Sequence, residues 1–150
     1  MTYKDLLHLV DTAAIYVEQY SYETKNKNSF DRQNDKNIYR TDYWYGMYKF
    51  YSKGEVNCFF FEDNYNILPK DLNPEYKGYR GVYYRENSVI KMDLFIVVGE
   101  HIQWGMEANI LKFEGDTLLV KRIVKLDPRK VTVYVKRKLP KEYLIYKADW

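Results

Sequence analysis

The sequence predicts a single all-β domain, residues 1–150: an antiparallel up-and-down barrel of about eight strands with a short N-terminal helical turn. Three observations support this prediction. Tyrosine, which suits half-buried strand positions, occurs 17 times in 150 residues. From residue 38 onward, short apolar segments alternate with turn sequences, and the spacing of a strand–helix–strand unit is absent. Closing the sheet into a barrel removes its unpaired edges, and a sandwich of two sheets is the alternative.

The expected elements follow the chain in order. Residues 2–10 are expected to form one or two helical turns, with Thr2 as the N-cap. The polar segment 23–37 and the proline-containing segment 63–76 are expected to be loops, and residues 139–150 either turn into a helix or pack against the outside. The expected strands are residues 12–22, 39–51, 55–62, 78–85, 89–98, 102–113, 117–126 and 130–138.

Turn residues separate these strands. Lys53-Gly54 supplies the positive φ that a tight hairpin needs. The other expected turns lie at Glu86-Asn87, at Glu114-Gly115-Asp116 and at Asp127-Pro128. The strands are therefore expected to be joined mainly as hairpins.

Alternation with a period of two predicts which side chains point into the barrel. Glu107 and Asn109 fall on the expected outer face, and a shift of the apolar phase to Leu111 and Phe113 predicts a β-bulge. The expected inward residues of the strands 89–98 and 102–113 are Ile90, Met92, Leu94, Ile96, Val98, Ile102, Trp104, Met106, Ala108 and Ile110.

The segment Met47–Glu62 carries six aromatic residues in sixteen positions. Residues 43–51 are apolar on both faces, which predicts that their outer face is also covered, with the N-terminal turns as the candidate cover. The lone cysteine lies in this dense aromatic segment and is expected to be a buried, inert thiol. The expected inward residues are Tyr48, Phe50, Val56, Cys58 and Phe60.

An eight-stranded barrel is either filled by side chains or holds one small ligand. Arg122 lies between Val120 and Val124, so it is the candidate anchor for a ligand carboxylate. In the simpler interpretation Arg122 lies at a strand end and extends its guanidinium into water. The residues expected to line a ligand cavity are Tyr48, Phe50, Phe60, Tyr83, Trp104, Met106 and Arg122.

Composition and charge limit the other partners. The net charge is +3, and nine Lys or Arg residues with one Asp occur in residues 121–141. Such a segment is typical of a solvated face that protects sheet edges, and an anionic membrane or an acidic partner are alternatives. Nucleic acid is disfavoured because no RRM, KH or zinc signature accompanies it. The longest apolar segment, residues 94–98, is far shorter than the ~20 residues of a membrane span.

No enzyme, cofactor or metal ion is expected from the motifs. The sequence contains no G-x-S-x-G, phosphate-binding glycine loop or H-E-x-x-H. His8 and His101 are the only histidines, and neither has metal-ligand spacing to Cys58. The N-terminus lacks the features of a signal peptide, so the chain is either intracellular or begins after a removed signal.

Several motifs occur in a familiar order: YRTDYWY, MYKFYSKGEV, LNPEYKGYRGVYY, ILKFEGDTLLV and VTVYVKRK. Over residues 38–138 this order resembles the lipocalin-like small proteins of the bacterial cell envelope, often lipoproteins of unassigned function. The Gly-x-Trp signature of the well-characterised lipocalins is replaced here by Trp44-Tyr45-Gly46. The resemblance implies a barrel, exported to the periplasm or anchored to a membrane by lipid, with no catalytic residues to carry over.

Two functional hypotheses follow. The leading one is a non-enzymatic barrel that binds a small hydrophobic molecule in its interior. The other is a barrel with a solid core that contacts a protein partner through its loops and the basic segment 121–141. The presence or absence of an internal cavity discriminates between them.

Overall fold

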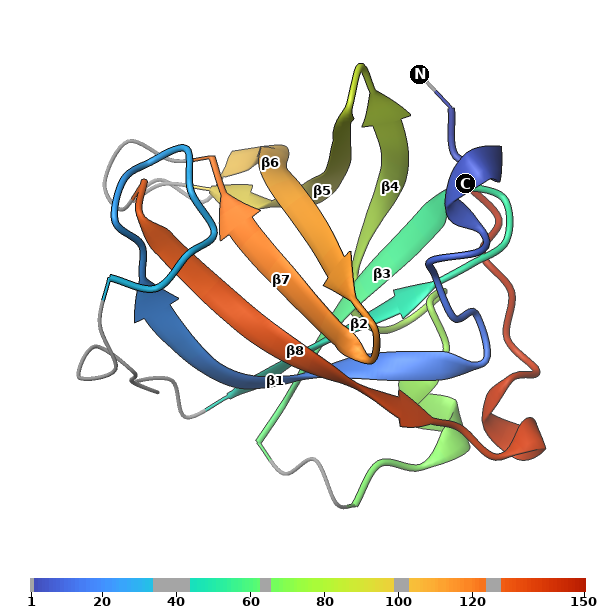
Figure 1. The fold of residues 1–150 in the computed structure, drawn as a ribbon. Coiled ribbons are helices and arrows are strands. Elements are labelled where there is room, and N and C mark those ends of the chain that lie inside the picture. The colour runs from blue at the N-terminus through green and yellow to red at the C-terminus, as the bar shows by residue number, and fades with distance from the viewer. Residues whose placement is uncertain (1, 34–43, 63–65, 99–102, 124–127) are drawn as a thin grey trace.

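The computed structural model describes residues 2–33, 44–62, 66–98, 103–123 and 128–150. Eight antiparallel strands pair in chain order, and β8 pairs with β1 to close the barrel (Figure 1). The predicted fold class is therefore confirmed. The strands are β1 (Ala14–Glu23), β2 (Tyr45–Phe50), β3 (Glu55–Phe61), β4 (Tyr79–Glu86), β5 (Val89–Val98), β6 (Gln103–Glu114), β7 (Thr117–Arg122) and β8 (Lys130–Lys138).

The hairpin turns form where the sequence predicts them. Gly54, Asn87 and Gly115 have φ angles of 91°, 57° and 62°, values that glycine and asparagine tolerate best. Residues 39–43 and 124–126, predicted to be strand, lie outside the described residues. Asp127, part of a predicted turn, lies outside them as well.

One β-bulge occurs in β1 and changes which of its side chains face inward. The register between β1 and β8 shifts between Glu18 and Tyr20. Before the shift Tyr16 belongs to the interior cluster, and after it Ser21 pairs with Thr132 of β8. The extra residue therefore moves the inward phase by one position.

The bulge predicted within β6 is wrong, and so is the phase assigned to the first half of that strand. Glu107 is paired with Leu94, and Asn109 with Met92, in an uninterrupted register. Cross-strand partners share a face of the sheet, and Leu94 and Met92 are buried in the interior cluster. Glu107 and Asn109 therefore point inward, in phase with Leu111. The positions predicted for Ile102 and for the side chain of Val98 lie outside the described part of the chain.

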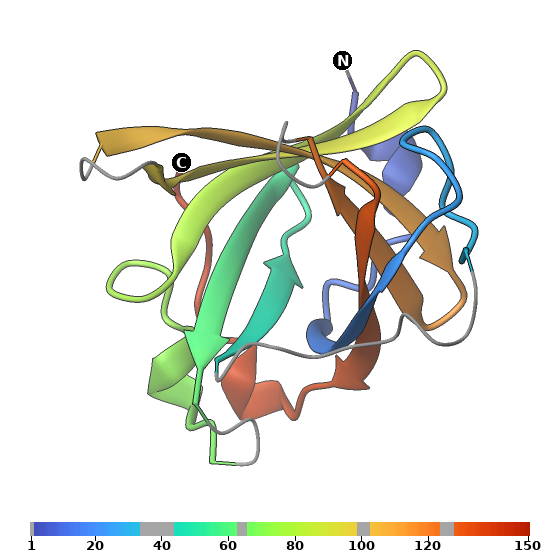
Figure 2. The same cartoon turned by 90° about the vertical axis from the view of Figure 1, so that its left-hand side faces the viewer.

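The N-terminal segment closes one end of the barrel. It contains η1 (Lys4–Leu6), a 3-10 turn, and Leu6 is fully buried in the interior cluster together with Val10. Thr2 forms a β-bridge with Arg85 at the end of β4, which fixes the segment across the barrel (Figure 1, right). We call this the closed end; Figure 2 views the barrel from the opposite, open end.

The outer face of β1 to β3 is covered, but the predicted cover was wrong. The N-terminal turns close the barrel instead, and the cover is formed by two 3-10 turns, η3 (Pro69–Leu72) and η4 (Lys141–Tyr143), with their flanking residues. Tyr143 donates from its hydroxyl to the carbonyl of Ile67 at 2.8 Å. The outer cluster comprises Ile15, Val17, Met47, Phe59, Ile67 and Leu72.

The C-terminal residues pack against the outside of the barrel, one of the two predicted outcomes. The indole of Trp150 donates to the carbonyl of Gly81 at 2.9 Å, and its ring lies 6.1 Å from that of Tyr51. Gly81 has no room for a side chain, because a Cβ there would lie 2.4 Å from the carbonyl oxygen of Asp93.

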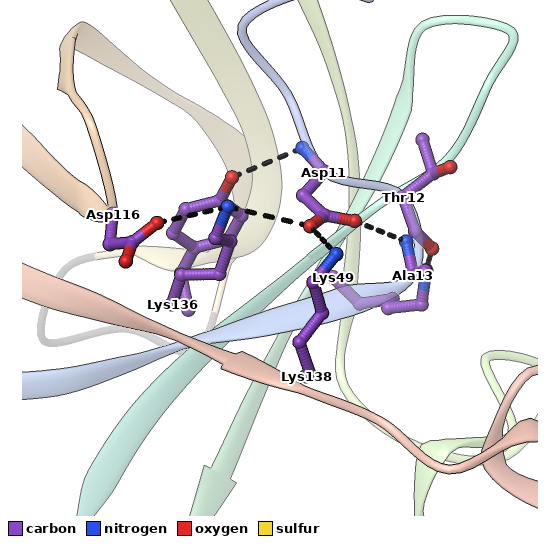
Figure 3. Close-up of polar contacts among 8 residues, drawn as sticks. Asp11, Thr12, Ala13, Lys49, Asp116, Lys136 and Lys138 are labelled. Carbon is purple, nitrogen blue, oxygen red and sulfur yellow. Dashed lines mark hydrogen bonds and ion pairs between the residues drawn. The ribbon is translucent and has the colours of Figure 1, made fainter.

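A polar cluster around Asp11 joins the N-terminal segment to the strands at the closed end (Figure 3). Asp11 pairs with Lys138 and, at 3.5 Å, with Lys136 of β8. The ammonium of Lys49 donates to the carbonyls of Thr12 and, at 3.0 Å, Phe50. Burial lowers the pKa of Lys49 to about 8.

Candidate functional site

The open half of the barrel contains a cavity of about 850 Å³ that is open to solvent. Its size lies within the range of natural small-molecule sites. Residues from all eight strands contribute to its lining, together with Trp44 immediately before β2. The side chains of the interior cluster pack together toward the closed end, which we call the solid half, and the cavity lies toward the open end.

Two tyrosines and the cysteine form the floor of the cavity. Tyr48, Cys58 and Tyr134 come from β2, β3 and β8, and each is at most 7% exposed. The rings of Tyr48 and Tyr134 lie 4.8 Å apart. Burial raises the pKa of both phenols. Burial also raises the pKa of the Cys58 thiol, and the negative charge of Glu107 raises it further. The prediction that Cys58 is buried is confirmed, and that it is inert stays a prediction, which the raised pKa favours.

The wall formed by β6 and β7 is polar. Glu107 is 9% exposed, and its Oε2 lies 2.9 Å from a guanidinium nitrogen of Arg122. Asn109, 1% exposed, donates from Nδ2 to Glu107 Oε1 at 3.4 Å and to the carbonyl of Met92 at 3.4 Å. Arg122 lies at the end of β7 with its side chain 56% exposed. Arg122 therefore combines features of both hypotheses. It lines the cavity, as a ligand anchor would, and it lies at a strand end with its guanidinium exposed to water.

A second carboxylate lies on the wall formed by β1 and β2. Glu18, the last inward residue before the bulge, is 9% exposed. Its Oε2 accepts a hydrogen bond from the backbone N–H of Gly46 at 2.8 Å. A Cβ at Gly46 would lie 3.0 Å from that oxygen and 3.4 Å from the hydroxyl of Tyr134. The absence of a side chain at Gly46 therefore lets the carboxylate reach the backbone.

Hydroxyl groups and a lysine continue the polar lining toward the mouth. Ser21 and Thr132 share a hydrogen bond of 2.9 Å between their hydroxyls, and Thr132 lines the cavity. Lys130, at the start of β8, also lines it. The lining therefore contains both cationic and anionic groups, with Arg122 and Glu107 side by side.

The rim is aromatic. Trp44 and Phe60 are 49% and 48% exposed and line the cavity together with Tyr79. Rings follow one another from this rim along the surface: Phe60 to Tyr79 at 5.9 Å, Tyr79 to Trp104 at 6.2 Å, and Trp104 stacked on Phe95 at 5.2 Å. Such rings can receive the flat apolar body of a ligand.

Three of the seven predicted site residues line the cavity: Tyr48 at the floor, and Phe60 and Arg122 near the mouth. Phe50 and Tyr83 point inward as expected, but they belong to the solid half, with ring centroids 5.1 Å apart.

The inward positions predicted for Trp104 and Met106 are wrong. These side chains are 58% and 60% exposed and do not line the cavity. The apolar phase of β6 faces water here because its polar phase occupies the barrel interior.

The alternation pattern missed Glu18, Glu107, Asn109 and Tyr134. A signal for Glu107 and Asn109 was present in the sequence: they continue the phase of Leu111 and Phe113, which do point inward. This shared phase predicts polar side chains inside the barrel. The alternation rule assigns polar residues to the solvent-facing side, so it placed Glu107 and Asn109 outside. For Glu18 and Tyr134 the pairing of β1 with β8 was needed, and those residues are more than a hundred positions apart.

No protein-family model, curated protein or solved structure matches this chain. Within the described residues, no helix is long and apolar enough to cross a membrane. Among those residues there is also no group of three or more His, Cys, Asp or Glu side chains that could hold a metal ion. Fold and site together define a closed, eight-stranded antiparallel β-barrel with a solvent-open internal cavity, an arrangement consistent with a lipocalin-like fold.

Proposed function

We propose that this protein binds one small molecule in the open half of its barrel and releases it chemically unchanged. The observation that carries the proposal is the cavity of about 850 Å³, in which aromatic, aliphatic and polar side chains converge. Natural binding sites combine a mostly apolar lining with a few placed polar groups, and this cavity has both. The solid half of the barrel supports the site because its packed rings fix the same strands.

The ligand that fits this lining is amphipathic. Leu94, Ile96 and Val120 supply aliphatic wall, and Trp44 and Phe60 supply aromatic rim. The polar groups of β1, β6 and β7 also line the cavity, and two of them adjoin this wall: Glu107 pairs with Leu94 across the strands, and Arg122 follows Val120 on β7. A purely apolar ligand would displace water from these groups and give them no hydrogen bond in return, which is costly, so a ligand with at least one polar group is favoured.

The test combines native mass spectrometry with a cavity-filling variant. The purified protein is expected to carry a discrete extra mass that organic extraction removes, or to bind the neutral fluorophore N-phenyl-naphthylamine at one equivalent. Val120→Trp places an indole in the cavity, because Val120 is 5% exposed and lines it. Val82→Trp is the matched control, since Val82 is 40% exposed and outside the lining.

Loss of binding in Val120→Trp but not in Val82→Trp would support the proposal. Equal binding by both variants would contradict it, because the occupied site would then lie elsewhere. A bare chain that binds no fluorophore would also contradict it and would leave the protein-partner hypothesis as the alternative.

The resemblance of residues 38–138 to small envelope barrels supports a location in the bacterial cell envelope for this binding activity. Fractionation of cells that express the native gene tests this part separately. Recovery in the periplasm or with membranes would support it, and recovery in the cytoplasm alone would contradict it.

A further inference from the structure

We propose that the ligand is an arylalkylamine, whose protonated amine enters first and is bound by the carboxylates of Glu18 and Glu107 on the walls of the cavity. This inference rests on the proposed function and adds the polarity of the ligand to it. It reverses the expectation that Arg122 anchors a ligand carboxylate.

The first argument is the distribution of hydrogen-bond donors and acceptors. An ammonium group offers three donors and no acceptor, so it needs a site rich in oxygen. Two carboxylates and two phenolic oxygens, from Glu18, Glu107, Tyr48 and Tyr134, line the cavity. A ligand carboxylate there would need donors, and the amide of Asn109 already donates to Met92 and Glu107.

The second argument is the acceptor capacity of Glu107. An ionised carboxylate offers about four lone-pair positions. Among the described residues, Glu107 receives one contact from Arg122 on Oε2 and one from Asn109 on Oε1. Positions therefore remain on both oxygens for the hydrogen atoms of an amine. Because the Arg122 side chain is 56% exposed, it can turn to water if the amine takes its place.

The third argument is the burial of the two carboxylates. Glu18 and Glu107 are each 9% exposed, whereas the side chain of Arg122, which pairs with Glu107, is 56% exposed. Opposite charges attract more strongly where water is excluded. A cation that takes the place of the Arg122 guanidinium is therefore stabilised by buried carboxylates. The upward shift of the Cys58 pKa, caused first by burial and then by Glu107, is consistent with a negative potential at the floor.

The fourth argument concerns the body of the ligand. The rings of Tyr48 and Tyr134 at the floor present faces to which a cation is attracted. The exposed rings of Trp44 and Phe60 at the rim can stack on an aromatic group at the other end of the same molecule. An aromatic ring joined to an amine by a short alkyl chain satisfies both ends.

The test uses three probes with one skeleton: naphthylethylamine, naphthylethanol and naphthylacetate. Isothermal titration calorimetry at neutral pH measures Kd for each. The amine is expected to bind about tenfold or more tightly than the alcohol, and the carboxylate is expected to bind weakest. Raising the salt concentration is expected to increase the Kd of the amine probe by less than tenfold, because the carboxylates are largely buried and therefore little screened.

Charge-neutral variants then locate the amine. Glu18→Gln and Glu107→Gln keep the side-chain shape, and the glutamine oxygen at position 18 can still accept from Gly46. Each is expected to weaken the amine about tenfold and to leave the alcohol unchanged, since only the ion pair is lost. Glu142→Gln is the matched control, because Glu142 is exposed on η4 and remote from the cavity lining.

The outcomes separate the two proposals. If all three probes bind equally, or if neither glutamine variant weakens the amine, the cavity still binds ligands but the amine inference is overturned. Tightest binding of the carboxylate, lost in Arg122→Gln, would overturn it in favour of the arginine anchor. If no probe binds but the protein carries an extractable mass or binds N-phenyl-naphthylamine, only the amine inference is overturned. If it does neither, the proposed function fails as well.

Discussion

The two ends of the barrel are built from the same eight strands but have opposite interiors. At the closed end Phe50 packs edge-on against Tyr16, Tyr83 and Phe113, with ring centroids 5.1 to 5.9 Å apart. Leu6 covers this cluster and is fully buried. At the open end the same strands surround a cavity with two carboxylates, an amide and an arginine. Stability and binding are therefore separated along the barrel axis.

The change from one interior to the other occurs residue by residue along each strand. On β6 the inward positions from the closed end to the open end are Phe113, Leu111, Asn109 and Glu107. On β7 they are Leu118, Val120 and Arg122. These two strands thus contribute large apolar groups to the closed half and polar groups to the open half. Substitutions at the two ends should consequently have different effects on stability and on binding.

The largest expected effect is at the closed end. Phe50→Ala removes a fully buried ring from the aromatic cluster and leaves a cavity. We expect the free energy of unfolding to fall by about 3–5 kcal/mol, measured by urea denaturation. Phe60→Ala at the rim is the matched control and should cost less than about 1 kcal/mol, because that ring is already 48% exposed. Equal losses would show that the rim contributes to the core as much as the closed end does.

The next effect is a dependence of stability on pH from Lys49 at the closed end. Its pKa is about 8 in the folded protein and 10.5 without burial. The unfolded chain therefore binds this proton more tightly, and stability rises as the pH increases from about 8 toward 10.5. The full gain is at most about 3 kcal/mol.

The variant Lys49→Met should remove this rise, as measured by urea denaturation at several pH values. Above pH 10 the sign reverses. Burial raises the pKa of Tyr48, Tyr51, Tyr83 and Tyr134, so these phenols keep their protons in the folded state, and stability is lost as the unfolded chain ionises. A flat profile for the wild type between pH 8 and 10 would contradict the role of Lys49.

A smaller effect comes from Asp11. Burial favours the neutral acid, but hydrogen bonds from Lys138 and the Ala13 N–H, with the charges of two lysines, lower its pKa overall. Asp11→Asn should cost about 1 kcal/mol at pH 7. The wild type should lose this contribution as the pH falls below about 4, because stability from a carboxyl with a lowered pKa disappears on protonation.

Asp116→Asn is the matched control for Asp11→Asn. Asp116 pairs with Lys136 as well, but its side chain is 77% exposed. No measurable loss of stability is expected from this control. A loss equal to that of Asp11→Asn would show that a surface pair, rather than the attachment of the N-terminal segment, is responsible.

The smallest expected effect on stability is at the open end and has the opposite sign. Glu107→Leu removes a buried carboxylate whose desolvation is only partly offset by Arg122. We expect the unfolding free energy to rise by up to about 1 kcal/mol, while binding of the naphthylethylamine probe is lost. A strong destabilisation by this variant would mean that the polar wall is structural, which would break the separation between the two ends.

The sequence by itself determined the strand order, the hairpins and the solid half of the interior. Local chemistry suffices for these: Gly54 and Asn87 make tight turns wherever they occur, and Phe50, Tyr83 and Met92 are apolar in the phase that their strands bury. Part of the candidate site was also predictable, since Tyr48, Phe60 and Arg122 line the cavity.

Only the tertiary structure decided which face of β6 points inward and which segment closes one end of the barrel. A pleated strand presents two faces that are locally equivalent, and pairing with neighbouring strands selects one of them. The partners of Glu107 and Asn109, Leu94 and Met92, place these polar residues inside and leave Trp104 in water. Alternation assumes a dry interior, and it fails in the half of this barrel whose interior is open to solvent.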